Sequence, residues 1–115
     1  MKNVDVADLE KIELNIAQAK TLIEYGDALA RLEQNADYKK IIATDFFEKN
    51  IIRLVKLKAA PQVQDEKNQA YITAQINAVG HFDQYLTGIR IQSNSAKVAL
   101  QRDAEERELI LSEKE

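Results

Sequence analysis

The side chains that could do chemistry are few in this sequence. His81 is the only histidine, and the chain has no cysteine. A zinc site needs several nitrogen, sulfur or carboxylate ligands at suitable spacing, and neither H-E-x-x-H nor E-x-x-H occurs. The three glycines, Gly26, Gly80 and Gly88, are isolated within helical patterns, so they form no phosphate-binding loop. We therefore predict no catalytic residue, no metal and no cofactor.

Carboxylates could do acid–base work only in a pocket that shifts their pKa values. Glu105 and Glu108 are one helical turn apart, but they lie in a strongly charged tail. Asp83 is next to Phe82 and close to Tyr85, so we expect it to be partly buried. A buried Asp in a helix more often fixes pairing and register than it catalyses a reaction. We expect its partner on another helix or another chain.

Charge is segregated along the chain. Residues 1–38 carry four basic and eight acidic side chains (4 − 8 = −4), whereas residues 39–58 carry six and two (6 − 2 = +4). A middle segment opposite in sign to its neighbour favours antiparallel folding or assembly with other copies. The sequence pI of about 5.3 argues against nucleic-acid binding. The candidate basic contact face consists of Lys49, Arg53, Lys56 and Lys58.

Apolar spacing predicts a first helix over about 5–34. Its apolar residues recur in steps of three and four, which is the spacing of a coiled-coil stripe. Asp5 and Asp8 lie in or before its first turn, where carboxylates favour the helix dipole. The candidate interface residues on this helix are Leu9, Ile12, Ile16 and Ile23.

A second helical segment is predicted over about 38–58, as a short helix that runs into a longer one. Asp37 is predicted as its N-cap, and Thr44-Asp45 is the candidate for a second cap at the junction. Pro61 disfavours helical geometry in the residue before it, so residues 59–64 are predicted to form a loop.

The longest helix is predicted over about 65–111, with Asp65 as its N-cap. Gly80, Gly88 and the run Ser93-Asn94-Ser95 weaken it, so a kink near residues 88–95 remains an alternative. The charged tail, residues 101–115, is either frayed or docked through Leu109, Ile110 and Leu111. The remaining candidate interface residues are Ile72, Ile76, Val79, Phe82 and Leu86.

These elements predict an all-α fold in one domain. We expect an elongated antiparallel helical hairpin or a three-helix bundle with coiled-coil character and one long C-terminal helix. No run approaches the roughly 20 apolar residues that span a bilayer, so no membrane association is expected. The acidic N-terminus has no signal-peptide core, so we expect the chain to be cytoplasmic where it is made.

One resemblance covers most of the chain. The series Ile51-Ile52-Arg53-Leu54-Val55, the loop Pro61 to Asp65, the helix from Ile72 and the glutamate-rich end resemble small helical proteins of tailed bacteriophages. Those proteins are encoded among head and tail morphogenesis genes. The resemblance implies a virion component or assembly factor that works in multiple copies, with other virion proteins as further partners. It implies no site residue.

The sequence thus predicts a non-enzymatic structural or assembly protein that forms homo-oligomers through its first and last helices. The alternative is a small regulatory protein that binds and inhibits or adapts a host or viral enzyme through its basic middle segment. Both hypotheses assign the function to contacts between proteins.

Overall fold

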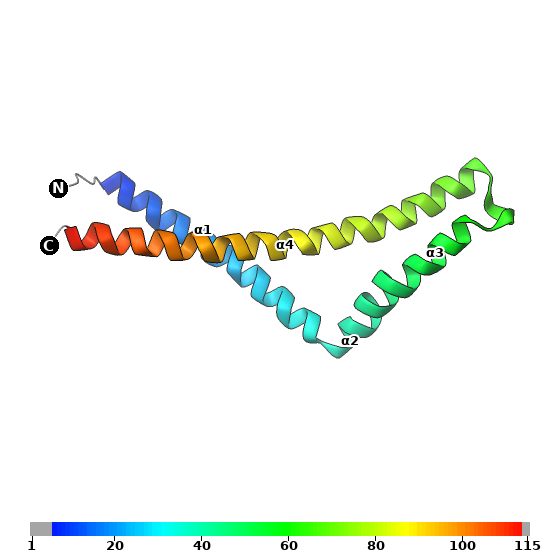
Figure 1. Cartoon of the computed structure of the whole chain (residues 1–115), viewed down its shortest axis with the longest axis horizontal. Helices are drawn as coiled ribbons and strands as arrows, with labels where there is room; N and C mark the ends of the chain where they lie inside the picture. The colour runs from blue at the N-terminus through cyan, green and yellow to red at the C-terminus, as the bar shows by residue number, and fades with distance from the viewer. Residues whose placement is uncertain (1–5, 114–115) are drawn as a thin grey trace. The chain divides into compact units, whose positions relative to one another are not determined.

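The protein is all-α in a computed structural model that describes residues 6–113 (Figure 1). The predicted helix start at Asp5 lies outside the described residues. Within them the elements are three α-helices longer than one turn, one single turn, one π-helix and one 3-10 turn. In chain order they are α1 (Val6–Gln34), α2 (Ala36–Tyr38), η1 (Lys39–Lys49), α3 (Asn50–Lys58), η2 (Pro61–Val63) and α4 (Glu66–Glu113).

The buried residues of α1 follow the predicted heptad spacing. Ile12, Ile16 and Ala19 are buried, and Leu9 and Ile23 are half-buried. The buried stripe then continues to Leu29, whereas the neighbouring Ala30 is exposed. A heptad repeat allows a step of three or four at each turn, so the spacing alone could not decide between these two neighbours.

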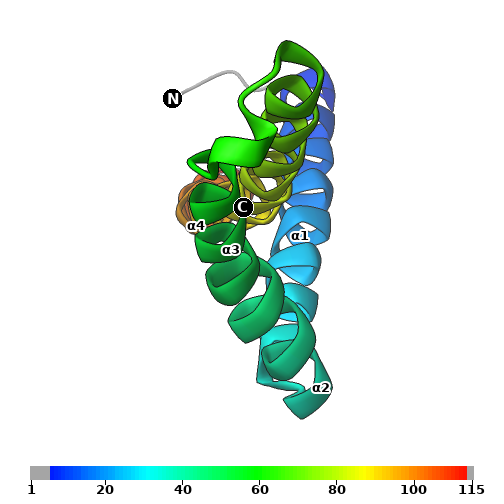
Figure 2. The ribbon, with the colours of Figure 1, turned by 90° about the vertical axis from the view of Figure 1, so that its right-hand side faces the viewer.

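α2, η1 and α3 form one uninterrupted helical run (Figure 2). The predicted N-cap Asp37 is wrong: the Asn35 side chain accepts hydrogen bonds from the backbone N–H groups of Asp37 and Tyr38, each at 3.0 Å. The predicted second cap at Thr44-Asp45 is also wrong, because both residues lie inside η1. Asn35 directly precedes this run, and it is the N-cap of the whole helical segment from α2 to α3.

η1 is wound more loosely than an α-helix. The backbone N–H at its C-terminal end, from Asn50, donates to the carbonyl of Asp45, five residues back. Half-buried residues accordingly recur as neighbouring pairs every four positions, at 42/43, 46/47 and 50/51. The wider turn lets both Phe46 and Phe47 pack inward, whereas a 3.6-residue turn separates adjacent side chains by about 100°.

The loop between α3 and α4 is held by two glutamine side chains. The Gln64 amide donates to the carbonyls of Lys58 and Ala60, and the half-buried Gln69 amide donates to those of Lys58 and Val63. The two bonds to Lys58 satisfy a carbonyl at the end of α3 that lacks an intrahelical partner. Asp65 caps α4 as predicted, since its carboxylate accepts from the Asn68 backbone N–H at 3.1 Å.

α4 is continuous through the region where a kink was the alternative. It runs 48 residues, from Glu66 to Glu113, and Ser93-Asn94-Ser95 lies within it. Ser93 is buried, at 3% exposure, so this polar residue takes a position in the covered stripe. The prediction of one long C-terminal helix is confirmed.

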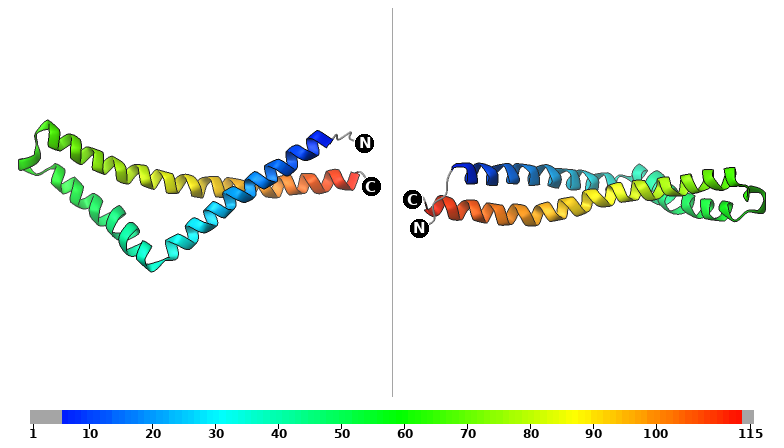
Figure 3. Two further views of the ribbon diagram at one scale, coloured as in Figure 1. Left: turned by 180° about the vertical axis from the view of Figure 1, so that it is seen from behind. Right: turned by 90° about the horizontal axis from the view of Figure 1, so that it is seen from above.

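Residue contacts divide the chain into two compact units. Unit 1 combines α1 up to Leu29 with α4 from Ile89 onward, and these two segments run antiparallel (Figure 3). Ile12, Ile16 and Ile110 form its buried cluster, and Leu100 packs against them. The early residues of α1 thus meet the late residues of α4.

Unit 2 extends from Ala30 to Gly88. The chain follows η1 and α3, turns at η2 and returns along the first part of α4 (Figure 1). Leu54, Ile72 and Val79 are its buried centre, and Phe46, Phe47, Ile51, Val63 and Ile76 pack around them. Three phenyl rings extend this core, with centroids 5.4–5.8 Å apart for Phe46, Phe47 and Phe82.

Candidate interaction surfaces

The predicted interface residues of α1 and α4 are mostly covered within the chain itself. Their apolar faces pack against the neighbouring segment of the same unit, as the two hydrophobic clusters show. Whether a partner also contacts them stays a prediction. The buried residues are Ile12, Ile16, Ile72, Val79, Leu86 and Ile110, and the half-buried ones are Leu9, Ile23, Ile76 and Phe82.

The apolar triplet near the C-terminus divides between two roles. Ile110 is buried at 3% exposure against Ile12 and Ile16, so α4 is docked in unit 1 as far as this residue. Leu109 and Leu111 are 61% and 42% exposed. Arg107 lies 3.4 Å from Glu13 and joins α4 to α1 by an ion pair at the edge of the same contact.

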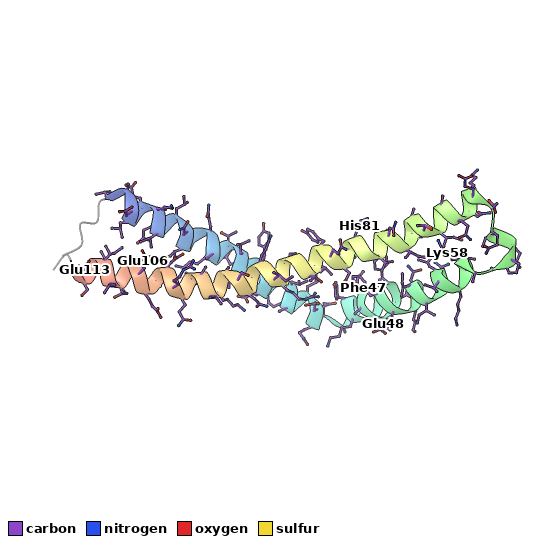
Figure 4. The ribbon with its side chains drawn as sticks, turned by 45° about the horizontal axis from the view of Figure 1, so that its top comes forward. Phe47, Glu48, Lys58, His81, Glu106 and Glu113 are labelled. Atoms are coloured by element: carbon purple, nitrogen blue, oxygen red, sulfur yellow. The ribbon has the colours of Figure 1, made fainter. Side chains whose placement is uncertain are left out.

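The basic contact face is smaller than the four residues predicted. Lys49, Arg53 and Lys56 are exposed, and their spacing of four and three places them on one side of η1 and α3. Lys58 turns inward instead, and its ammonium group donates to the Thr73 hydroxyl of α4 (Figure 4). The remaining three cations form an exposed basic strip within unit 2.

The prediction that Asp83 is partly buried is wrong, and a different carboxylate of α4 is buried. Asp83 is exposed, whereas Asp103 in unit 1 is 7% exposed. Asp103 lies 3.7 Å from Arg102 and lines a groove of about 390 Å³ with Asp8, Lys11 and Glu106. Continuing the three–four spacing of α4 beyond Leu100 leads to position 103, so the sequence did contain this signal.

A second groove of unit 1 lies between α1 and α4. It measures about 440 Å³, and small or amide side chains line most of it. Ala19 and Leu22 contribute from α1, and Ile91, Ala96 and Ala99 from α4. Ile91 is 59% exposed, so this groove is an open depression between two helices.

A further exposed surface, which was not predicted, lies on α4 in unit 2. Residues 68–82 contain no Asp, Glu, Lys or Arg, in a chain that is 30% charged. Four exposed residues of this region, together with Tyr85 just beyond it, recur in steps of three and four, and we call these five residues the tyrosine face. They are Tyr71, Ala74, Ala78, His81 and Tyr85.

Figure 4 shows His81 on the side of α4 that is turned away from Phe47 and η1. Tyr71 and Tyr85 are 66% and 65% exposed. The tyrosine face therefore lies outside the phenylalanine-lined contact that joins α4 to η1 and α3.

Among residues 6–113, no group of three or more His, Cys, Asp or Glu side chains is placed to hold a metal ion. None of the helices described has a stretch both long and apolar enough to cross a bilayer. Compared with protein-family models, curated proteins and solved structures, the chain matches none.

Proposed function

We propose that this protein is a non-enzymatic structural or assembly component that works by helix-mediated association with copies of itself. The observation that carries the proposal is the tyrosine face, an uncharged helical surface left exposed beside a complete intrachain core. Interface centres are depleted in charged residues and enriched in aromatic ones, tyrosine included. A side of α4 that served only to face solvent would be expected to carry Lys and Glu, as most exposed helix faces do.

The resemblance to tailed-phage morphogenesis proteins supports a role in the virion or in its assembly. Such a protein would be made in the host cytoplasm and would then join other copies and other virion proteins. A gene position beside portal, scaffold or coat genes would support this part of the proposal. A position among metabolic genes, together with absence of the protein from purified particles, would contradict it.

The self-association is tested by light scattering and sedimentation equilibrium over a wide concentration range. We expect the average mass to rise with concentration above that of the 13.1 kDa chain. A constant monomer mass up to the highest soluble concentration would overturn the proposal.

The basic strip supports one alternative, a regulatory protein that binds an acidic surface of a host or viral enzyme. Lys49, Arg53 and Lys56 are exposed together, and complementary charge accelerates and directs association. This alternative predicts stoichiometric capture of one foreign enzyme by the wild-type chain. It also predicts loss of that capture in Lys49→Glu/Arg53→Glu, with no change in the mass of the purified protein alone.

A further inference from the structure

The positions of the two exposed tyrosines follow the winding of α4. Tyr71, Ala78 and Tyr85 each come immediately before a buried residue, namely Ile72, Val79 and Leu86. They therefore occupy the same position in three consecutive heptads and keep the same orientation to the core of unit 2. At a rise of 1.5 Å per residue, the 14 residues between the tyrosines span roughly 21 Å. The face is long enough to accept another helix.

A partner that packs on the tyrosine face must itself present an uncharged surface. Covering a charged side chain without a partner costs far more than covering a neutral one. The acidic side chains of α1 and the basic strip of α3 are therefore poor matches. Within the described residues, the exposed uncharged helical surfaces that fit are the tyrosine face itself and the stripe of α1 that contains Leu14, Tyr25 and Leu32. Of these two, the tyrosine face is the one that pairs with a tyrosine face through the same patch on both subunits. This points to a second copy of the chain as the partner.

We propose that the tyrosine faces of two copies pack against each other in antiparallel orientation, about a two-fold axis near Ala78. The inference rests on the proposed self-association and assigns it a surface. Two-fold pairing is the commonest arrangement of homo-oligomers, and it uses the same patch on both subunits. Because Tyr71 and Tyr85 are each seven residues from Ala78, the axis places Tyr71 beside Tyr85 of the partner subunit, and the reverse.

The small residues of the face permit the close approach that this pairing needs. Ala78 would meet Ala78 of the partner subunit at the crossing, and Ala74 would lie near the level of the partner's His81. Small side chains at a crossing point allow two helix backbones to come together, while larger ones on either side fill the space. The two large residues of the face, Tyr71 and Tyr85, lie at equal distances of seven residues on either side of Ala78.

The surface area that this contact can bury indicates how stable the dimer should be. A tyrosine can bury roughly 150–250 Å², so four tyrosines that are each about two-thirds exposed contribute roughly 400–650 Å². Specific interfaces begin at roughly 1,200 Å² in total, and the flanking alanines, amides and His81 must supply the remainder. The contact is at the small end of the range, so we expect a dimer that dissociates on dilution.

The decisive variant is Ala78→Glu, which places two like charges next to each other at the axis. Ala78 is exposed and Glu is a good helix former, so the variant keeps its fold and helical circular dichroism. The control is Asn77→Glu, which adds the same charge on the same turn at a position about 100° around the helix. In sedimentation equilibrium we expect the dissociation constant of the dimer to rise at least tenfold for Ala78→Glu and to change little for Asn77→Glu.

Orientation is tested by cross-linking, which is clean because the chain has no cysteine. We expect Ala78→Cys to form a disulfide-linked dimer with itself under mild oxidation. A mixture of Tyr71→Cys with Tyr85→Cys should form disulfide-linked dimers that contain one copy of each variant. Neither variant alone should form a disulfide-linked dimer. Tyr71→Cys dimers formed as readily as mixed ones would overturn the antiparallel arrangement.

The proposed self-association and the proposed surface can be contradicted separately. If the wild-type chain associates and Ala78→Glu associates equally well, this surface is wrong while self-assembly stands. If the wild-type chain is monomeric at every concentration, both are wrong. Equal weakening by Ala78→Glu and Asn77→Glu would assign the effect to net charge and would also contradict the surface.

Discussion

Gly26 of α1 lies directly against the side chain of Ser93 of α4 in unit 1. A Cβ atom built on Gly26 would overlap both Oγ and Cβ of Ser93. Ser93 is buried at 3% exposure, so it has little room to move aside. The pair explains both a glycine in the middle of a helix and a serine in an apolar stripe.

We expect Gly26→Ala to destabilise the protein. The substitution gains about 1 kcal/mol of helix propensity, but overpacking at a buried contact typically costs about 1–3 kcal/mol. The colliding Cβ atoms are attached directly to the backbone on both sides. We therefore expect the overpacking cost to lie in the upper part of its range and to exceed the gain in helix propensity. Urea denaturation followed by circular dichroism measures the change in the free energy of unfolding.

The second substitution at this contact separates overlap from other effects. Ser93→Ala leaves the Cβ that collides with the new methyl group, so it should not rescue Gly26→Ala. Ser93→Gly removes that atom and should recover part of the lost stability in the double variant. A double variant whose stability loss equals the sum of the two single losses would show that the two positions do not touch.

Gly80→Ala is expected to have the opposite effect. A Cβ at Gly80 meets no atom within 4 Å, and the residue is exposed. The alanine therefore gains helix propensity without a collision, and we expect the free energy of unfolding to rise by up to about 1 kcal/mol. The same urea titration checks it, and a loss of stability would mean that this side of α4 is already covered in solution.

Sequence patterns predicted the helices and most of the covered stripe, because burial on a helix repeats at heptad spacing. Ile72, Val79 and Leu86 are examples in α4. The choice of cap was beyond such patterns, since Asn35 and Asp37 are both good caps and differ only in where the helix begins. The open winding of η1 was also missed, although Phe46 and Phe47 side by side in an apolar pattern hinted at it.

The candidate surface could not be predicted by the same route. Apolar spacing shows that a helix has faces to bury, but it does not show which of them the chain itself covers. The tyrosines at 71 and 85 carry the same pattern as the buried residues after them, and only packing separates the two sets. The charge-free run from 68 to 82 was visible in the sequence and indicates where such a second face should be sought.

The three-ring cluster of unit 2 provides a test of how η1 is held against α4. Phe82 makes two of its three ring contacts, at 5.8 Å to Phe46 and 5.5 Å to Phe47. Phe82→Ala should cost about 2–4 kcal/mol, because a fully buried ring would cost more and this one is half-buried. Phe82→Leu keeps most of the volume and should cost less than about 1.5 kcal/mol. Equal losses in the two variants by urea denaturation would contradict this expectation, because they would assign the whole effect to the aromatic ring and none of it to the volume that leucine retains.

Asp65 links the start of α4 to pH. Its carboxylate accepts hydrogen bonds from the Asn68 side-chain amide at 2.7 Å and from the Asn68 backbone N–H at 3.1 Å. These bonds, the side-chain one first, hold the pKa of Asp65 below its ordinary value of 3.8. A lowered pKa in the folded state means that the ionised form stabilises the fold. The contribution is fully present above the ordinary value, and it is lost as the pH falls through the folded pKa.

Asp65→Asn isolates this contribution, because asparagine is also a good N-cap but does not titrate in this range. We expect the difference in unfolding free energy between wild type and Asp65→Asn to be constant near neutral pH. It should shift against the wild type as the pH falls through the acid range below 3.8. The other carboxylates are common to both proteins and largely cancel in the difference. Asp83→Asn makes the same chemical change in the interior of α4 and serves as the control. A difference for Asp65→Asn that stays flat down to the acid limit would contradict the cap, because an uncoupled carboxylate has the same pKa in the folded and unfolded chain.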